Sequence, residues 1–228
     1  MDISLYYQEK GYGMPFLLLH GNGEDSTYFR HQISYFSNKY RVIAIDTRGH
    51  GNSARGTAPF TIEQFADDLN ELMTQLQIPQ AIILGFSDGA NIAMKFVLKY
   101  PHKVKALILN GGNLDAKGIK RSVQLPIEIG YHITKLFAAK SQEANRHKEL
   151  LSLMVDEPMI KCDALHSIQA PTLVIAGTKD MIKQDHTELI AANIPNAKLV
   201  IMKGNHFIAN KKSHTFNQEI ESFLYTIT

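Results

Sequence analysis

The chain has little cysteine and no tryptophan: Cys162 is its only cysteine among 228 residues. A single cysteine excludes an intramolecular disulfide, which favours a reducing compartment. The first residues lack the basic segment and long apolar run of a secretory signal. No apolar run approaches the ~20 residues that a membrane span requires. We therefore expect a cytoplasmic protein without a membrane span.

There is also no excess of charge of either sign. The 24 basic residues nearly balance the 22 acidic ones, and no dense basic run occurs, which argues against nucleic acid as a partner. The histidines and carboxylates show no metal-ligand spacing such as H-E-x-x-H, so we predict no metal and no cofactor. The length favours one domain with an insertion over two domains. The oligomeric state stays open.

Short apolar runs alternate with helical patterns along the chain. Six such runs cover residues 16–19, 42–45, 81–84, 106–109, 173–176 and 199–202, and an edge strand is expected over 3–7. A capping box at 61–64 opens one helical pattern, and another covers 215–225. The runs are apolar on both faces, which predicts an α/β fold with a mostly parallel central sheet and helices on both faces.

One long stretch has helical patterns but no strand pattern. Its helical segments are expected at 126–138, 142–155 and 158–165. We interpret residues 115–170 as a small helical cap inserted over the carboxyl edge of the sheet. Residues 1–114 and 171–228 then form the core domain. The alternative is that these helices only extend the scaffold.

A G-x-S-x-G pentapeptide, G-F-S-D-G at 85–89, stands between the third of these runs and a helical pattern. Glycines on both sides permit a sharp strand-to-helix turn that lifts a serine hydroxyl out of the sheet. This context proposes Ser87 as a nucleophile. Alone the pentapeptide is a weak signal, because glycine and serine are common in loops.

A serine nucleophile needs a base, and the base needs an acid that orients it. Asp180 follows the run 173–176, and His206 follows the run 199–202, so both are expected at the carboxyl edge of a parallel sheet, where ligands bind. Asp115 is the rival acid. His186 and His214 also follow Asp180, but both fall in helical patterns and are expected at the surface. Cys162 is expected to be a small buried hydrophobe.

The order serine, acid, histidine is the chain order of α/β-hydrolases. Together with H-G-N-G at 20–23, D-T-R-G-H-G-N-S at 46–53 and the segment 163–173 before Asp180, it makes nearly the whole chain resemble the α/β-hydrolase superfamily. The resemblance implies an oxyanion hole formed by the backbone N–H groups of Asn22 and Asp88. It also implies that His20 and Gly21 support this loop.

The predicted function is hydrolysis of a small-molecule carboxylic ester, thioester or activated amide through an acyl-enzyme on Ser87, so the expected partner is a small-molecule acyl substrate. A carbon–carbon bond hydrolase or lyase of the same superfamily, and a ligand-binding relative without catalysis, are the alternatives. The G-x-S-D-G elbow also resembles that of valacyclovir-hydrolase-like enzymes, which implies that Asp88 contacts a substrate amine. Otherwise Asp88 only complements the start of its helix.

Overall fold

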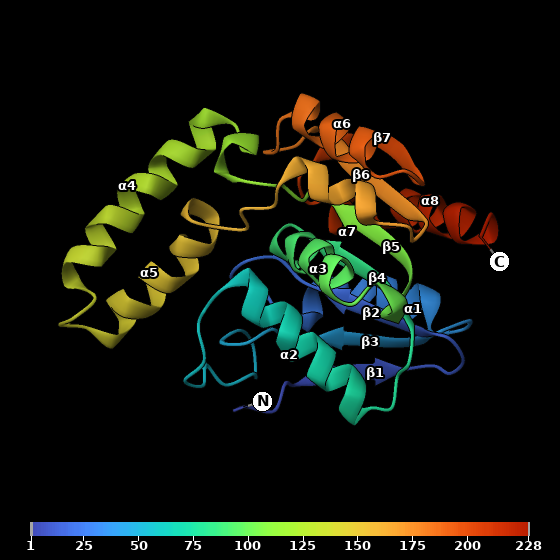
Figure 1. Ribbon diagram of the computed structural model, residues 1–228, viewed down its shortest axis with the longest axis horizontal. Coiled ribbons are helices and arrows are strands. Elements are labelled where there is room, and N and C mark those ends of the chain that lie inside the picture. The colour runs from blue at the N-terminus through green and yellow to red at the C-terminus, as the bar shows by residue number, and fades with distance from the viewer. Residues whose placement is uncertain (1, 228) are drawn as a thin grey trace.

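The fold is built on one seven-stranded sheet, seen in a computed structural model that describes residues 2–227 (Figure 1). Its strand order is β1-β3-β2-β4-β5-β6-β7, with β1 antiparallel to β3 and all other pairs parallel. The predicted α/β class with a mostly parallel sheet is confirmed. The strands are β1 (Tyr7–Lys10), β2 (Pro15–Leu19), β3 (Arg41–Ile45), β4 (Ala81–Phe86), β5 (Val104–Asn110), β6 (Thr172–Lys179) and β7 (Ala197–Asn205).

Helices cover both faces of this sheet because its central strands are apolar on both faces. On β2, Leu17 and Leu19 pack into one apolar cluster while Phe16 and Leu18 pack into the other. Fully burying one such side chain stabilises the fold by about 1.5–3 kcal/mol. The first cluster includes residues of α2 (Ile62–Gln75), α3 (Asp88–Lys99) and α6 (Gln184–Asn193), and the second includes residues of α1 (Arg30–Phe36), α7 (Ile208–Lys211) and α8 (Ser213–Tyr225).

The start of α2 shows how local sequence sets an element. The hydroxyl of Thr61 accepts a hydrogen bond from the backbone N–H of Gln64 at 3.1 Å, as the capping box predicts. Phe65, Leu69 and Leu72 then follow at helical spacing and are all buried. The Thr61 side chain satisfies a free N–H at the start of the helix, and the spacing supplies one apolar face. The sequence therefore predicts both the start of α2 and its buried side.

The edge strand lies later in the chain than predicted. It was expected over 3–7, whereas β1 covers Tyr7–Lys10. The preceding residues bind the loop after β3 instead. The Tyr6 N–H donates to the Ser53 hydroxyl at 2.8 Å, and the Tyr6 carbonyl accepts from the Asp46 N–H at 2.9 Å. These long-range bonds decide where the ladder begins, and period-two patterning alone cannot reveal them.

A hairpin of two helices projects beyond the carboxyl ends of the parallel strands (Figure 1). It consists of α4 (Arg121–Phe137) and α5 (Gln142–Val155). The second matches the predicted 142–155, but α4 begins five residues before the expected start at Pro126. Gln124 is buried and donates to the Met154 carbonyl of α5 at 3.1 Å, so packing between the helices extends α4 past the proline.

The third expected cap helix, 158–165, is not an α-helix. A 3-10 helix at Cys162–Ser167 replaces it. Leu165 and Ile168 from this segment are buried in the apolar cluster beneath the sheet. This packing holds the segment against the core, so only α4 and α5 form the projecting hairpin. Within residues 2–227, none of the helices combines the length and apolarity needed to cross a membrane.

Candidate functional site

Ser87 occupies the sharp turn between β4 and α3. Its φ of 53° and ψ of −119° are strained for a residue with a side chain. A Cβ added to Gly85 would collide with the backbone of Gly89, and one added to Gly89 would collide with the backbone of Leu19. Glycine is therefore required on both sides of the serine. The Ser87 N–H donates to the Asn110 carbonyl of β5 at 2.8 Å, which fixes the turn on the sheet.

Asp180 and His206 meet at the same edge of the sheet, because each directly follows one of the paired strands β6 and β7. Their side chains are buried, and Nδ1 of His206 lies 2.6 Å from Oδ1 of Asp180. An ionised carboxylate only accepts, so Nδ1 carries the proton and Nε2 has the free lone pair. Among the described residues, Nε2 is buried and has no hydrogen-bond partner. This is the tautomer that a general base needs.

The surroundings keep Asp180 ionised. Burial raises its pKa, but the hydrogen bond from His206 and the N–H groups of Ile182 and Gly177 outweigh burial and hold the pKa below its usual value. The Asp180 backbone is held as well, since the Lys120 ammonium donates to its carbonyl at 2.5 Å. Lys120 lies just before α4, and no motif in the sequence pointed to it.

Aromatic rings form the wall beside the base. The Phe86 ring, next to Ser87 in sequence, lies 4.8 Å from the His206 ring, and Tyr28 stacks on Phe86 at 4.5 Å. The Tyr28 hydroxyl is buried and has no hydrogen-bond partner within residues 2–227.

The alternative acid, Asp115, and the alternative bases, His186 and His214, differ from Asp180 and His206 in their contacts. The Asp115 side chain accepts from the Lys117 N–H at 2.8 Å and caps a short helix. His214 is exposed, as expected. The expectation that His186 is a plain surface residue is wrong, because it is only partly exposed and its Nε2 accepts from the Leu114 N–H at 3.0 Å. Burial accordingly lowers the pKa of His186.

The loop after β2 brings Asn22 next to the nucleophile turn. Gly21 packs so closely that an added Cβ would lie 3.1 Å from the Ser87 Cβ. The loop closes with a bond from the Glu24 N–H to the Gly21 carbonyl at 3.2 Å. The side chain of Asn22 reaches the helical hairpin, where its amide donates to the Leu150 carbonyl of α5 at 2.7 Å. The N–H of Asp88 is in the first turn of α3, where a helix supplies no acceptor.

His20 is buried and uses both ring nitrogens. Its Nδ1 lies 2.7 Å from the Gly21 carbonyl, and its Nε2 accepts from the Thr47 N–H at 3.0 Å. With Nδ1 protonated and Nε2 accepting, the ring joins the loop after β2 to the loop after β3. Burial is the main cause that lowers the pKa of His20, so the ring is neutral near pH 7. These contacts fit a structural rather than a catalytic residue.

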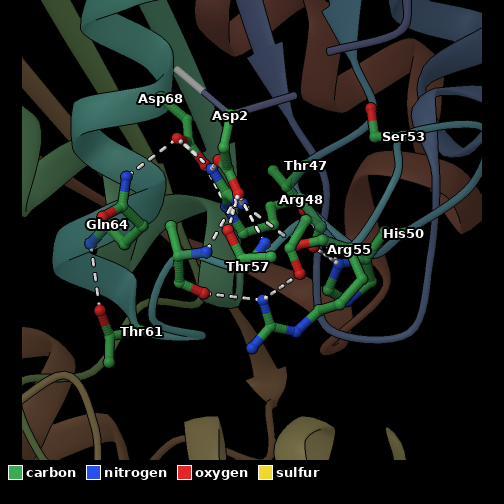
Figure 2. Close-up of polar contacts among 12 residues, drawn as sticks. Asp2, Thr47, Arg48, His50, Ser53, Arg55, Thr57, Thr61, Gln64 and Asp68 are labelled. Atoms are coloured by element: carbon green, nitrogen blue, oxygen red, sulfur yellow. Dashed lines mark hydrogen bonds and ion pairs between the residues drawn. The ribbon is translucent and has the colours of Figure 1, made fainter. Parts of the chain in front are cut away.

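The loop after β3 is fixed in turn by Arg48, whose side chain is fully buried (Figure 2). Figure 2 shows the Asp68 and Asp2 carboxylates directed at its guanidinium group. Asp68 accepts from Nε and Nη2 at 2.7 Å each, and Asp2 accepts from Nη1 and Nη2. Asp2 also accepts from the N–H groups of Thr57 and Ala58. These ion pairs and hydrogen bonds join the N-terminal segment, the loop after β3 and α2. They therefore support the loop that His20 contacts.

Asp88 is a buried carboxyl beside the nucleophile. Within residues 2–227 its Oδ2 is buried without a hydrogen-bond partner, while its Oδ1 lies 3.4 Å from the Asn91 amide. Burial, reinforced by the charge of Glu157, raises the pKa of Asp88 to about 7, although Asn22 and Asn91 act in the opposite direction. Asn91 also binds Asn113 by two hydrogen bonds, at 3.0 and 2.9 Å, which hold it in place.

Glu24 is a second carboxyl at the site, and the sequence argument missed it. It follows the H-G-N-G segment, and one of its oxygens lies 3.4 Å from the Gly21 N–H. Burial raises its pKa to about 7, although the hydrogen bond from the Gly21 N–H partly opposes this. Its signal in the sequence was an acidic residue directly after the oxyanion loop. No three metal-ligating side chains gather into a possible metal site within the described chain.

A strained serine at a strand-to-helix turn, with a buried histidine–aspartate pair on later strands of a parallel sheet, defines the class of α/β proteins that carry a hydrolase-type site. The chain belongs to the alpha/beta hydrolase fold family, whose model matches residues 14–128.

Similar proteins span almost the whole chain. The 3-oxoadipate enol-lactonase 2 of Acinetobacter baylyi is 26% identical, with 98% of this chain and 94% of that protein covered. The serine hydrolase BPHL of Mus musculus is 27% identical, with 97% and 83% covered. A thermophilic esterase from Thermogutta terrifontis superposes with a TM-score of 0.83 at 23% identity, covering 99% of this chain and 94% of that one, which shows the fold alone. Family and relatives together indicate a hydrolase.

Proposed function

We propose that this protein is a serine hydrolase that cleaves small-molecule carboxylic esters through an acyl-enzyme. The observation that carries the proposal is the buried His206–Asp180 pair at 2.6 Å, whose Nε2 has no hydrogen-bond partner among the described residues and lies at the sheet edge where Ser87 follows β4. In this mechanism Ser87 attacks the acyl carbonyl while His206 takes its proton. Asp180 holds the imidazole in the required tautomer and stabilises its charged form.

The first step forms an ester between Ser87 and the acyl group and releases the alcohol, which takes the proton from His206. Water then attacks the acyl-enzyme while His206 takes its proton, and His206 returns this proton to the Ser87 oxygen as the carboxylic acid leaves. The oxyanion of each tetrahedral intermediate accepts hydrogen bonds from the N–H groups of Asn22 and Asp88. The position of Asp88 in the first turn of α3 supports this role, since its N–H needs an acceptor from outside the helix.

A fluorophosphonate probe tests the nucleophile. We expect it to label the folded chain at Ser87, and Ser87→Ala to lose the label and to lower ester turnover by roughly 10⁴–10⁶-fold. Ser122→Ala, on the exposed surface of α4, is the matched control and should keep both. Labelling at another residue, with Ser87→Ala still active, would exclude this mechanism.

A panel of acyl esters, thioesters and activated amides separates the alternatives. Turnover of simple acyl esters by the parent supports the esterase. Labelling at Ser87 without turnover of any ester, thioester or activated amide would favour a carbon–carbon bond hydrolase or lyase with the same residues. Absence of both labelling and turnover would favour a ligand-binding relative.

For the acyl group, we propose that Asp88 pairs with a cationic amine of the substrate. Its buried Oδ2, without a partner among the described residues, and its position beside Ser87 support this role. A substrate ammonium would supply the missing donor and the missing charge. The Glu157 carboxyl, which raises the pKa of Asp88, adds further negative potential.

A matched substrate pair tests this subsite. We expect the parent to prefer an α-amino-acyl ester over its des-amino analogue in kcat/KM, and Asp88→Asn to remove most of that preference. Losing one partner of a buried charge pair costs about 2–5 kcal/mol, a factor of roughly 30 or more. An unchanged preference in Asp88→Asn, or no preference in the parent, would leave Asp88 as a helix-end residue only.

A further inference from the structure

The outer face of α4 is apolar although it is exposed to solvent. Five of its large apolar side chains are between 43% and 75% exposed: Leu125, Ile129, Ile133, Leu136 and Phe137. At about 100° per residue they fall within an arc of about 120° on the helix. We call these five residues the α4 stripe. An arc of this width is what a helix normally buries against a neighbour.

The neighbour is not α5, because α5 packs on the other side of α4. Gly130 approaches Leu151, and the Tyr131 hydroxyl donates to the Asp156 carboxylate at 2.8 Å just beyond the end of α5. In Figure 1, α4 is the outer helix of the hairpin, far from the sheet. The α4 stripe therefore lies on a side of α4 that α5 does not cover, and its side chains are exposed.

We propose that the α4 stripe is the interface of a two-fold symmetric dimer, with a second copy of this chain as the partner. Five side chains that are about half exposed leave on the order of 500 Å² of apolar surface, at the upper end of what monomers display. Two copies would bury about 1,000 Å² in total, which reaches the area that a specific interface needs.

The stripe is self-complementary in an antiparallel arrangement. A two-fold axis that crosses α4 near residue 131 places Ile129 opposite Ile133 of the second copy, and Leu125 opposite Phe137. Because the axis makes the contact isologous, each of these pairs occurs twice. Large apolar residues then meet large apolar residues along the full length of the stripe.

The charges beside the stripe follow the same symmetry. Glu128 and Lys135 are seven residues apart, close to two helical turns, and so lie on one flank of the stripe. Their mean position is also near residue 131. The axis therefore brings Glu128 of each copy to Lys135 of the other. Arg121, one more heptad back on this flank, pairs with Glu128 at 2.6 Å within the chain and leaves the carboxylate partly exposed.

This charge pattern favours a second copy over a lipid surface. An interfacial helix that binds anionic lipid carries basic residues on its polar side, whereas here the centre of the flank is acidic.

The dimer would also fix the positions of the two α4–α5 hairpins relative to each other. The α5 helix joins the core through the bidentate pair between Arg55 and Glu149, at 2.8 and 3.0 Å, and the Asn22–Leu150 bond.

Sedimentation velocity over a concentration series of the full chain tests the proposal. We expect the parent to dimerise and Ile129→Glu to weaken the dimer at least tenfold, because a carboxylate would be buried against Ile133 of the second copy, twice by symmetry. Leu189→Glu, an exposed apolar residue of α6 outside the stripe, is the matched control and should dimerise like the parent. Circular dichroism checks that each variant is folded.

A charge exchange tests the antiparallel arrangement directly. Glu128→Lys and Lys135→Glu should each weaken self-association, since each places like charges across the axis twice. An equal mixture of the two variants should dimerise again, because all cross pairs become attractive. The proposal is overturned if the parent stays monomeric, if Ile129→Glu dimerises as the parent does, or if the mixture gains nothing over its components. A parent that binds anionic phosphatidylglycerol vesicles while staying monomeric in buffer would also overturn it.

Discussion

Replacing Asp88 with Asn should stabilise the free protein, and more so at high pH. The carboxyl has a pKa of about 7 in the fold because it is buried beside Glu157. An unfolded chain gives an aspartate a pKa of about 3.9. The folded state therefore binds this proton more tightly, and the stability it contributes is lost as the pH rises from about 4 through about 7.

The size of the effect follows from the same two values. A pKa of about 7 against about 3.9 corresponds to roughly 4 kcal/mol when the pH exceeds both. Asn keeps the shape and removes the charge, but its own amide must also be desolvated. We therefore expect Asp88→Asn to gain about 1–3 kcal/mol of unfolding free energy at pH 8.5 and little near pH 4.5.

Urea denaturation of parent and variant at both pH values measures this difference. Asp163→Asn, an exposed carboxyl, controls for the change in net charge. An equal gain at the two pH values would refute the argument, since an isosteric packing effect does not titrate. A loss of stability at pH 8.5 would show that the ionised carboxylate is satisfied in the free protein, and the reason for expecting a substrate cation there would disappear.

Two other predictions concern residues that hold the site. Asp180→Asn should lower kcat by about 10⁴-fold by favouring the wrong imidazole tautomer, whereas Asp115→Asn should stay near the parent, and esterase kinetics of both variants decide between the two acids. Arg48→Ala should destabilise the fold by about 3–5 kcal/mol in urea titrations because it strands the buried Asp68. The double variant Arg48→Met, Asp68→Leu should be closer to the parent, and an Arg48→Ala protein as stable as the parent would contradict the role of this network.

Much of the fold could be predicted because its signals are local. The six apolar runs became strands β2 to β7, since each run carries enough apolar side chains for both faces of the sheet. The cap at Thr61 started α2 as the sequence indicates. The edge strand was misplaced because the bonds of Tyr6 to Asp46 and Ser53 join segments some forty residues apart.

The candidate site shows the same division. Strand ends put Ser87, Asp180 and His206 at one edge of the sheet, and a parallel topology allows this to be inferred from order alone. The hydrogen bond from the Leu114 N–H to His186, the bond from Lys120 to the Asp180 carbonyl and the raised pKa of Glu24 were not predictable, because each depends on contacts with another part of the chain.

The sequence by itself determined the order of elements, the strained serine turn and the edge of the sheet at which chemistry is possible. These follow from residue periodicity and from the backbone freedom of glycine, which act over a few neighbours. Only the tertiary structure decided that Asp88 is buried without a partner for its Oδ2 among the described residues, and that an apolar face of α4 stays exposed. Burial and hydrogen-bond pairing depend on contacts between segments that are distant in the sequence, so they are decided only when the chain folds.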